Sequence, residues 1–123
     1  MGPTISFIQT KNGRIFGGFT MAEWINKKKI LQDENAFLFS LNNKKKYDIL
    51  KPETAINCIP EEWTLIYGNN GDRYGIRLKS KFLEKNSFEN LDSKVYDTPS
   101  SFCLSGKNIF LVKEVEVFQV IFE

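Results

Sequence analysis

Two glutamates near the C-terminus have a spacing that could support catalysis. Glu114 and Glu116 lie two positions apart within Asn108–Phe122, the longest run in the chain with the composition of a β-strand. Side chains two positions apart on a strand share a face, with Cβ atoms about 7 Å apart. Two carboxyl groups at such a distance can act as general acid and general base, which is the chemistry of a carboxylate-dependent enzyme.

The neighbours of this pair favour a structural or binding role. Phe110, Val112, Phe118 and Val120 have the same two-residue spacing as the two acids. An unpaired carboxylate in such an apolar row is costly to bury, so we expect ion pairs with cross-strand Arg or Lys, or a β-bulge that turns the acids outward. A protein-contact surface is therefore the better hypothesis for the pair than an active site.

The composition limits the remaining chemistry. The 123-residue chain contains no histidine, which excludes Ser-His-Asp and Cys-His mechanisms. Cys58 and Cys103 lie in apolar surroundings without a CxxC spacing, so we expect two buried, reduced thiols. Asp33, Glu34 and Asp72 lack the spacing of a calcium-binding loop. We predict a protein that is not an enzyme and that binds no cofactor and no metal.

Charge and hydropathy limit the partners. Lys and Arg number 17 and Asp and Glu 15, giving a net charge of +2, which predicts no general attraction to nucleic acid or anionic membranes. The triplets Lys27–Lys29 and Lys44–Lys46 are better interpreted as solvated turns than as a nucleic-acid site. No apolar run approaches the roughly 20 residues that span a bilayer, and no export signal is visible. We expect a cytoplasmic protein without membrane insertion that binds other proteins.

A pair of glycines interrupts a predicted strand near the N-terminus. Asn12–Gly13 predicts a type I′ hairpin turn between strands over Thr4–Gln9 and Arg14–Phe19. Gly17 and Gly18 lie inside the second strand, where glycine indicates a bulge or the close approach of another backbone. The pair is a feature of the scaffold.

A capping-box pattern follows this hairpin. Thr20 and Glu23 have the spacing at which two side chains satisfy the amides of a helix start, which predicts a helical turn over Met21–Asn26. Lys27–Lys29 would then form the solvated end of that short helix. Trp24 lies in the predicted turn.

Short apolar runs separated by Gly, Pro and Asn continue along the chain. The remaining expected strands are Ala36–Leu41, which is apolar on both faces and therefore central, Tyr47–Leu50, Ala55–Ile59, Trp63–Tyr67, Arg73–Leu78 and Asn108–Phe122. Lys79–Ser101 is polar, and we expect a long loop there that serves as an interaction surface. The pattern predicts one domain over residues 1–123, a mostly β, antiparallel sandwich with short peripheral helices.

Four segments resemble, in their order, the TLDc domain family. They are IFGGFTMAEW (Ile15–Trp24), DENAFLFSL (Asp33–Leu41), KVYDTP (Lys94–Pro99) and LSGKNIFLVKEVEVFQV (Leu104–Val120). The glycine pair and the EVEVF run are the most specific parts. The candidate protein-contact or family-signature residues are Gly17, Gly18, Trp24, Asp72, Gly106, Glu114 and Glu116.

The resemblance implies a β-sandwich with short helices and brings no settled catalytic residues. It also implies protection against oxidative damage and binding to the vacuolar-type proton pump (V-ATPase). A complete TLDc domain has a partly helical portion before the strand matched by Thr4–Gln9, so we expect this chain to lack that portion. The chain departs from the family at Trp63–Gly68, where a Gly-Pro-x-Phe-Gly element is common, and at Asn90–Asp92, where Asn-Leu-Gly is.

These observations predict a non-enzymatic TLDc-type interaction module. Its loops Pro60–Asp72 and Lys79–Ser101 and its free sheet edge would bind cytosolic subunits of the V-ATPase. One alternative is a structural component of a large assembly, such as a cytoskeletal or ciliary complex. The other is the carboxylate-dependent enzyme that uses Glu114 and Glu116.

Overall fold

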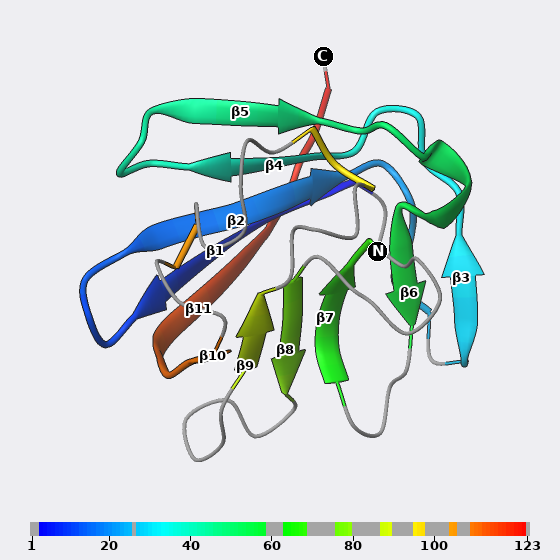
Figure 1. Ribbon diagram of the computed structural model, residues 1–123. Helices are drawn as coiled ribbons and strands as arrows, with labels where there is room; N and C mark the ends of the chain where they lie inside the picture. Colours follow the sequence, from blue (N-terminus) through cyan, green and yellow to red (C-terminus); the bar gives the residue numbers. More distant parts are fainter. Residues whose placement is uncertain are drawn as a thin grey trace.

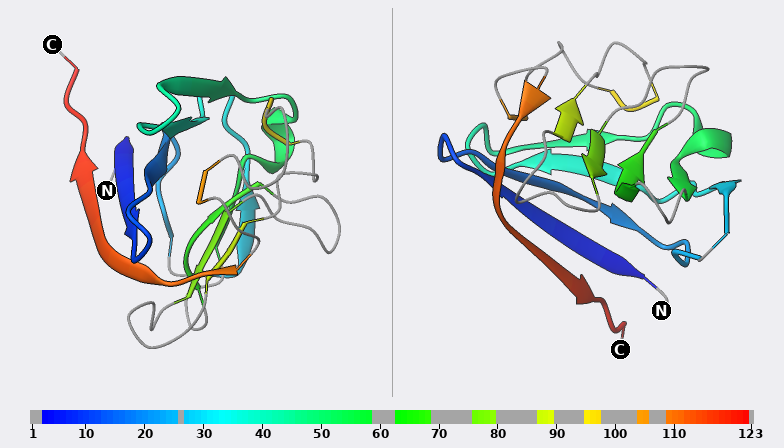
Figure 2. Two further views of the ribbon diagram at one scale, coloured as in Figure 1. Left: turned by 60° about the vertical axis from the view of Figure 1, so that its left-hand side comes forward. Right: turned by 90° about the horizontal axis from the view of Figure 1, so that it is seen from below.

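Runs of β-branched and aromatic residues between Gly, Asn and Pro turns form the strands of this protein. The computed structural model describes residues 3–25, 27–58, 63–68, 76–79, 87–89, 95–97, 104–105 and 109–122. Within these ranges two antiparallel β-sheets pack against each other, as seen in Figure 1 and from two further sides in Figure 2. The predicted mostly β, sandwich-type architecture is confirmed.

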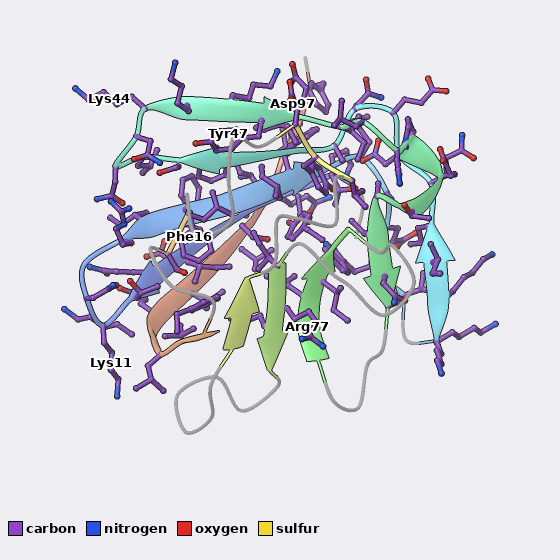
Figure 3. The ribbon with its side chains drawn as sticks, in the orientation of Figure 1. Lys11, Phe16, Lys44, Tyr47, Arg77 and Asp97 are labelled. Atoms are coloured by element: carbon purple, nitrogen blue, oxygen red, sulfur yellow. The ribbon has the colours of Figure 1, made fainter. Side chains whose placement is uncertain are left out.

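The first sheet contains five described strands in the order β11, β1, β2, β4, β5. Their bounds are Val112–Gln119 (β11), Thr4–Thr10 (β1), Ile15–Thr20 (β2), Phe37–Ser40 (β4) and Lys45–Asp48 (β5). Lys11 and Lys44 extend from the tips of the β1–β2 and β4–β5 hairpins, as Figure 3 shows. At Asn12–Gly13 only the glycine has positive φ (90°), so the turn is there but the type I′ prediction is wrong.

The second sheet contains six described strands in the order β10, β9, β8, β7, β6, β3. Their bounds are Ile109–Phe110 (β10), Ser87–Glu89 (β9), Ile76–Lys79 (β8), Trp63–Tyr67 (β7), Ile56–Cys58 (β6) and Lys29–Leu31 (β3). The predicted strand Asn108–Phe122 is divided at Leu111, because β10 pairs in this sheet and β11 in the other. Figure 2 shows the chain passing from one sheet to the other here.

Buried side chains from both sheets meet between them. Phe16 of β2 and Leu38 of β4 lie in the same core cluster as Tyr67 of β7 and Leu78 of β8. The ring of Phe16 meets that of Phe110 edge-on, with centroids 5.4 Å apart, where the chain passes between the sheets. The core therefore fixes which face of the five-stranded sheet points inward.

The helical turn predicted over Met21–Asn26 is wrong for the described residues 21–25, which form bends and irregular structure. Thr20 Oγ1 accepts a hydrogen bond of 3.0 Å from the Ala22 amide, as an N-cap would, but the next polar groups bond to Asp33 and no helix follows among these residues. The Oδ2 atom of Asp33 accepts hydrogen bonds from Thr20 Oγ1 at 2.5 Å and from the Met21 amide at 2.7 Å. Lys29 belongs to β3, so the lysine triplet does not end a helix. The described helical element is instead the 3₁₀ turn η1, Pro52–Thr54.

The segment Lys79–Ser101, predicted as one long loop, contains ordered structure. Besides β9, the described residues Val95 and Tyr96 are buried, and Tyr96 forms a β-bridge with Ile49. The Tyr96 hydroxyl donates a hydrogen bond of 2.8 Å to the Ala55 carbonyl. This part of the segment therefore belongs to the core and is not a free surface loop.

Candidate protein-interaction face

The face of the five-stranded sheet that points away from the six-stranded sheet, called the outer face below, is rich in large apolar side chains. Strand residues alternate between faces, so the neighbours of the core residues Ile8, Phe16 and Leu38 point outward. The outward apolar side chains are Ile5, Phe7, Ile15, Phe19, Phe37, Phe39 and Phe118. No described segment covers this face in the left view of Figure 2.

The first half of strand β1 contributes to this face. Its inward residues Thr4 and Ser6 are small and polar and fully buried, whereas the outward Ile5 and Phe7 are large and only half-buried. Only at Ile8 does the strand place a large apolar side chain in the core. An apolar sheet face of this kind marks a contact surface more often than a solvated one.

Phe7 is the centre of an aromatic cluster on the outer face. Its ring meets that of Phe39 edge-on with centroids 5.2 Å apart, and that of Phe118 at 6.0 Å. Gly17 lies between Phe7 and Phe39 in the cross-strand register, so the two rings close over a residue without a side chain. Phe19 and Phe37 stack beside them with centroids 5.1 Å apart.

The two adjacent glycines allow close contacts on opposite faces of the sheet. A Cβ atom on Gly17 would lie 1.7 Å from the Ser6 carbonyl oxygen and 3.0 Å from the Phe39 ring. A Cβ atom on Gly18 would lie 2.6 Å from the ring of Tyr67, which packs against it from the other sheet. The predicted close approach of another backbone is confirmed for Gly17, whereas at Gly18 the close neighbour is a side-chain ring.

Trp24 points toward the interior of the sandwich. Its Nε1 donates a hydrogen bond of 3.2 Å to Thr4 Oγ1, and its ring meets Tyr67 edge-on with centroids 5.5 Å apart. The side chain is half-buried. This geometry gives Trp24 a packing role beside the glycine pair.

Of the two alternatives for the glutamates, cross-strand ion pairs or a bulge that turns them outward, the structure contains the bulge. Gln9 pairs with Glu114 but the next residue, Thr10, pairs with Val112, so Lys113 is the extra residue. Val112 is fully buried, whereas Glu114 and Glu116 are exposed on the outer face. The bulge changes the alternation, so Val112 does not share the acids' face although Phe118 does.

Two open hollows lie on the outer face. The first, called the acidic hollow, has a volume of about 340 Å³ and is lined by Phe7, Gln9, Ile15, Leu41, Glu114, Glu116 and Phe118. The second, called the apolar hollow, has a volume of about 600 Å³ and is lined by Ile5, Phe19, Met21, Asn35, Phe37, Val120 and Phe122.

The sequence predicts that strand Ala36–Leu41 is central and buried on both faces. In the structure β4 pairs with a strand on each edge, as expected of a central strand, but the side chain of Leu41 is 50% exposed.

Other candidate positions contribute less to the described surface. Asp72, Gly106 and Cys103 lie outside the described residues, whereas Cys58 is buried in β6 as predicted. Among the described residues, no cluster of three or more His, Cys, Asp or Glu is placed to bind a metal ion. The described helical residues include no helix long and apolar enough to cross a membrane.

The described strands thus form a sandwich whose outer face carries large apolar side chains around two hollows. The family model of the TLDc domain matches residues 1–121. The chain therefore belongs to the TLDc domain family, as the four segments predicted. A search of curated protein sequences gives no significant match.

Proposed function

We propose that this chain is a non-catalytic protein-binding TLDc module and that its outer face contacts the partner. The observation that carries the proposal is the apolar outer face with its two hollows, at which Phe7 is half-buried and Phe118 is exposed. Phe118 is 49% exposed, and Phe122 at the rim is 64% exposed. Fully burying an exposed Phe contributes about 1.5–3 kcal/mol, so a few such contacts supply a useful affinity.

The partner that family membership suggests is the cytosolic part of the V-ATPase. Such binding would place the chain in the cytoplasm, and it would connect the module with resistance to oxidative damage. The acidic hollow supports a partner that presents apolar side chains beside Lys or Arg, because Glu114 and Glu116 are its charged lining residues. The loops proposed from the sequence lie largely outside the described residues, so the outer face is the better-supported contact.

The alternatives have weaker support. A structural role in a large cytoskeletal or ciliary assembly would use β11, which pairs with a described strand on one side only. For the enzyme hypothesis, Glu114 and Glu116 are exposed at an open surface, which is poorly suited to excluding water from a reaction. The exposure supports a contact role for both acids.

The proposal is tested by capture of V-ATPase subunits on the tagged chain. We expect the wild-type chain to retain them and Phe118→Asp to retain about tenfold less, the loss typical of an interface aromatic residue. Leu50→Asp is the matched control, because Leu50 is 53% exposed and lines neither hollow. Equal capture by both variants would exclude the outer face as the contact.

A link to oxidation resistance is tested in the same way. Cells that depend on this chain should survive peroxide with the Leu50→Asp variant and should lose survival with Phe118→Asp. Survival that is equal with both variants would separate the stress role from the outer face. Lost survival with Glu114→Gln/Glu116→Gln, while subunit capture stays intact, would instead support the carboxylate-dependent enzyme.

A further inference from the structure

One row of residues crosses all five strands of the outer face and carries opposite charges at its ends. In the cross-strand register Glu116 is opposite Phe7, Phe7 opposite Gly17, Gly17 opposite Phe39, and Phe39 opposite Lys46. The row therefore reads acid, aromatic, glycine, aromatic, base. It is symmetric about the glycine in everything except the sign of the terminal charge.

Such a row is complementary to a second copy of itself. A two-fold axis that runs parallel to the strands above Gly17 would bring the two outer faces together and reverse the order of the strands. Glu116 would then face Lys46 of the second copy, and Phe7 would face its Phe39. Gly17 of each copy would lie at the axis beneath its own Phe7 and Phe39 rings, so the rings of the two copies would form the centre of the contact.

We propose that the outer face binds a second copy of this chain in a symmetric, face-to-face dimer. The inference rests on the proposed function in one respect, that the outer face is a contact surface. A second copy is the occupant that the arrangement of charge selects, because acid and base lie at opposite edges of one apolar face.

The adjacent row has compatible chemistry. It consists of Phe118, Ile5, Phe19, Phe37 and Asp48 in register. The same rotation places Phe19 against Phe19 of the second copy and Ile5 against its Phe37, so the centre of the contact is apolar. At the rim the rotation places Asp48, which is 74% exposed and has its carboxylate 3.3 Å from Lys46 Nζ, opposite Phe118 of the second copy.

The geometry of packed sheets permits these pairings. Face-to-face sheets cross at about 30°, which displaces the end of a row about 10 Å from the axis by about 5 Å, within reach of Glu and Lys side chains. Lys46 is already held over this face, with its Nζ 4.7 Å from the centroid of the Phe37 ring. Glu116 is exposed on the opposite edge.

The size of the face predicts a weak dimer. A third outward row contains Glu114, Gln9 and Ile15. Five strands about 4.8 Å apart and three rows about 6.8 Å apart cover at most about 490 Å² per copy, or roughly 1,000 Å² for both copies. This area is at the lower limit of specific interfaces. We expect a dimer that forms reversibly as concentration rises and that competes with any protein partner for the same face.

Sedimentation velocity of the whole chain from micromolar to millimolar concentration tests the dimer. We expect the mass to rise from monomer to dimer. Glu116→Lys and Lys46→Glu should each weaken association about tenfold, because symmetry replaces two attractive pairs by two repulsive ones. The double variant Glu116→Lys/Lys46→Glu should restore association, since each pair is then reversed. Glu53→Lys, at an exposed acid of η1, is the control with the same charge change and should behave as wild type.

The outcomes separate this inference from the proposed function. A chain that stays monomeric at millimolar concentration would overturn the dimer. If the wild-type chain and Leu50→Asp still captured V-ATPase subunits and Phe118→Asp did not, the proposed function would nevertheless stand. A dimer equally strong in both single charge reversals would also overturn the inference, because the contact would lie elsewhere. Thermal unfolding of each variant shows whether a weakened dimer results from a misfolded chain. Restored association in the double variant would also argue against misfolding as the cause.

Discussion

The hydroxyl of Tyr67 lies 3.2 Å from the carbonyl oxygen of Gly18, so an aromatic ring of one sheet packs directly on the backbone of the other. The same hydroxyl lies 3.2 Å from Ser6 Oγ. This contact explains why β1 places a small polar residue inward: a larger side chain at Ser6 would occupy the space of the Tyr67 ring. The inner packing therefore limits the size of the β1 side chain at position 6, whereas Ile8 on the same face is a core residue.

The glycine pair gives the first prediction, an order of destabilisation. Gly18→Ala should lower the free energy of unfolding by about 1–3 kcal/mol, the usual effect of overpacking. Gly17→Ala should cost more, because its Cβ would meet the backbone oxygen of Ser6 at 1.7 Å, and backbone atoms cannot move aside as a ring can. Urea unfolding of both variants measures the order. A Gly17→Ala variant as stable as wild type would contradict the close pairing of β1 and β2.

The buried tyrosines predict a loss of stability in alkali. Burial raises the pKa of Tyr67 and of Tyr96 above the ordinary value of 10.0. Above pH 10 the unfolded chain loses these protons while the folded chain keeps them, so the folded state is disfavoured as pH rises. The free energy of unfolding should fall by about 1.4 kcal/mol per pH unit for each buried phenol.

Denaturant unfolding at a series of pH values above 9 measures this slope. Tyr67→Phe has no titrating hydroxyl at this position, so its slope should be shallower than that of wild type by about 1.4 kcal/mol per pH unit. The comparison cancels the contribution of the lysines, which titrate in the same range. Identical slopes in the two proteins would show that Tyr67 ionises without unfolding.

Asp33 is predicted to hold the connection between β2 and β3. Its carboxylate is buried and accepts hydrogen bonds from Thr20 Oγ1, from the Met21 amide and, at 2.9 Å, from the Asn35 amide. Asp33→Ala leaves these donors without their acceptor and should cost about 2–3 kcal/mol. The neighbouring Glu34 is exposed, so Glu34→Ala should have little effect in the same unfolding measurement. A small loss in Asp33→Ala would mean that water replaces the carboxylate.

The same carboxylate shows why one local prediction failed. Thr20 and Glu23 match a capping box when read alone, and Thr20 Oγ1 does accept from the Ala22 amide, but both the Thr20 hydroxyl and the Met21 amide donate to Asp33, which lies beyond the pattern. A sequence pattern of four residues contains no information about such a distant acceptor. The strands, in contrast, were largely predictable, because their alternation and turns are local properties.

The outer face was harder to predict for a physical reason. Alternation in β1 separates Thr4 and Ser6 from Ile5 and Phe7, and the usual rule assigns the larger apolar side chains to the core. In β1 the rule holds at Ile8 but fails at Ser6, which lies inward against the hydroxyl of Tyr67. Glu114 and Glu116 were recognised as a pair on one face, and the bulge that turns them outward was among the alternatives. That Phe7 and Phe39 meet over Gly17 depends on strand register, which sequence alone leaves open.

The aromatic pair over Gly17 gives the last prediction, an interaction energy. Phe7 and Phe39 meet edge-on at 5.2 Å, a geometry worth about 0.5–1.5 kcal/mol beyond the area that the rings bury. A double-mutant cycle with Phe7→Ala and Phe39→Ala should recover that energy from urea unfolding of the monomer. Phe110 packs on Phe16 on the inner side, so a cycle of Phe7→Ala with Phe110→Ala should be additive. Additivity in both cycles would mean that the rings do not meet in solution, and the pre-formed aromatic surface on which the proposed contact depends would be absent.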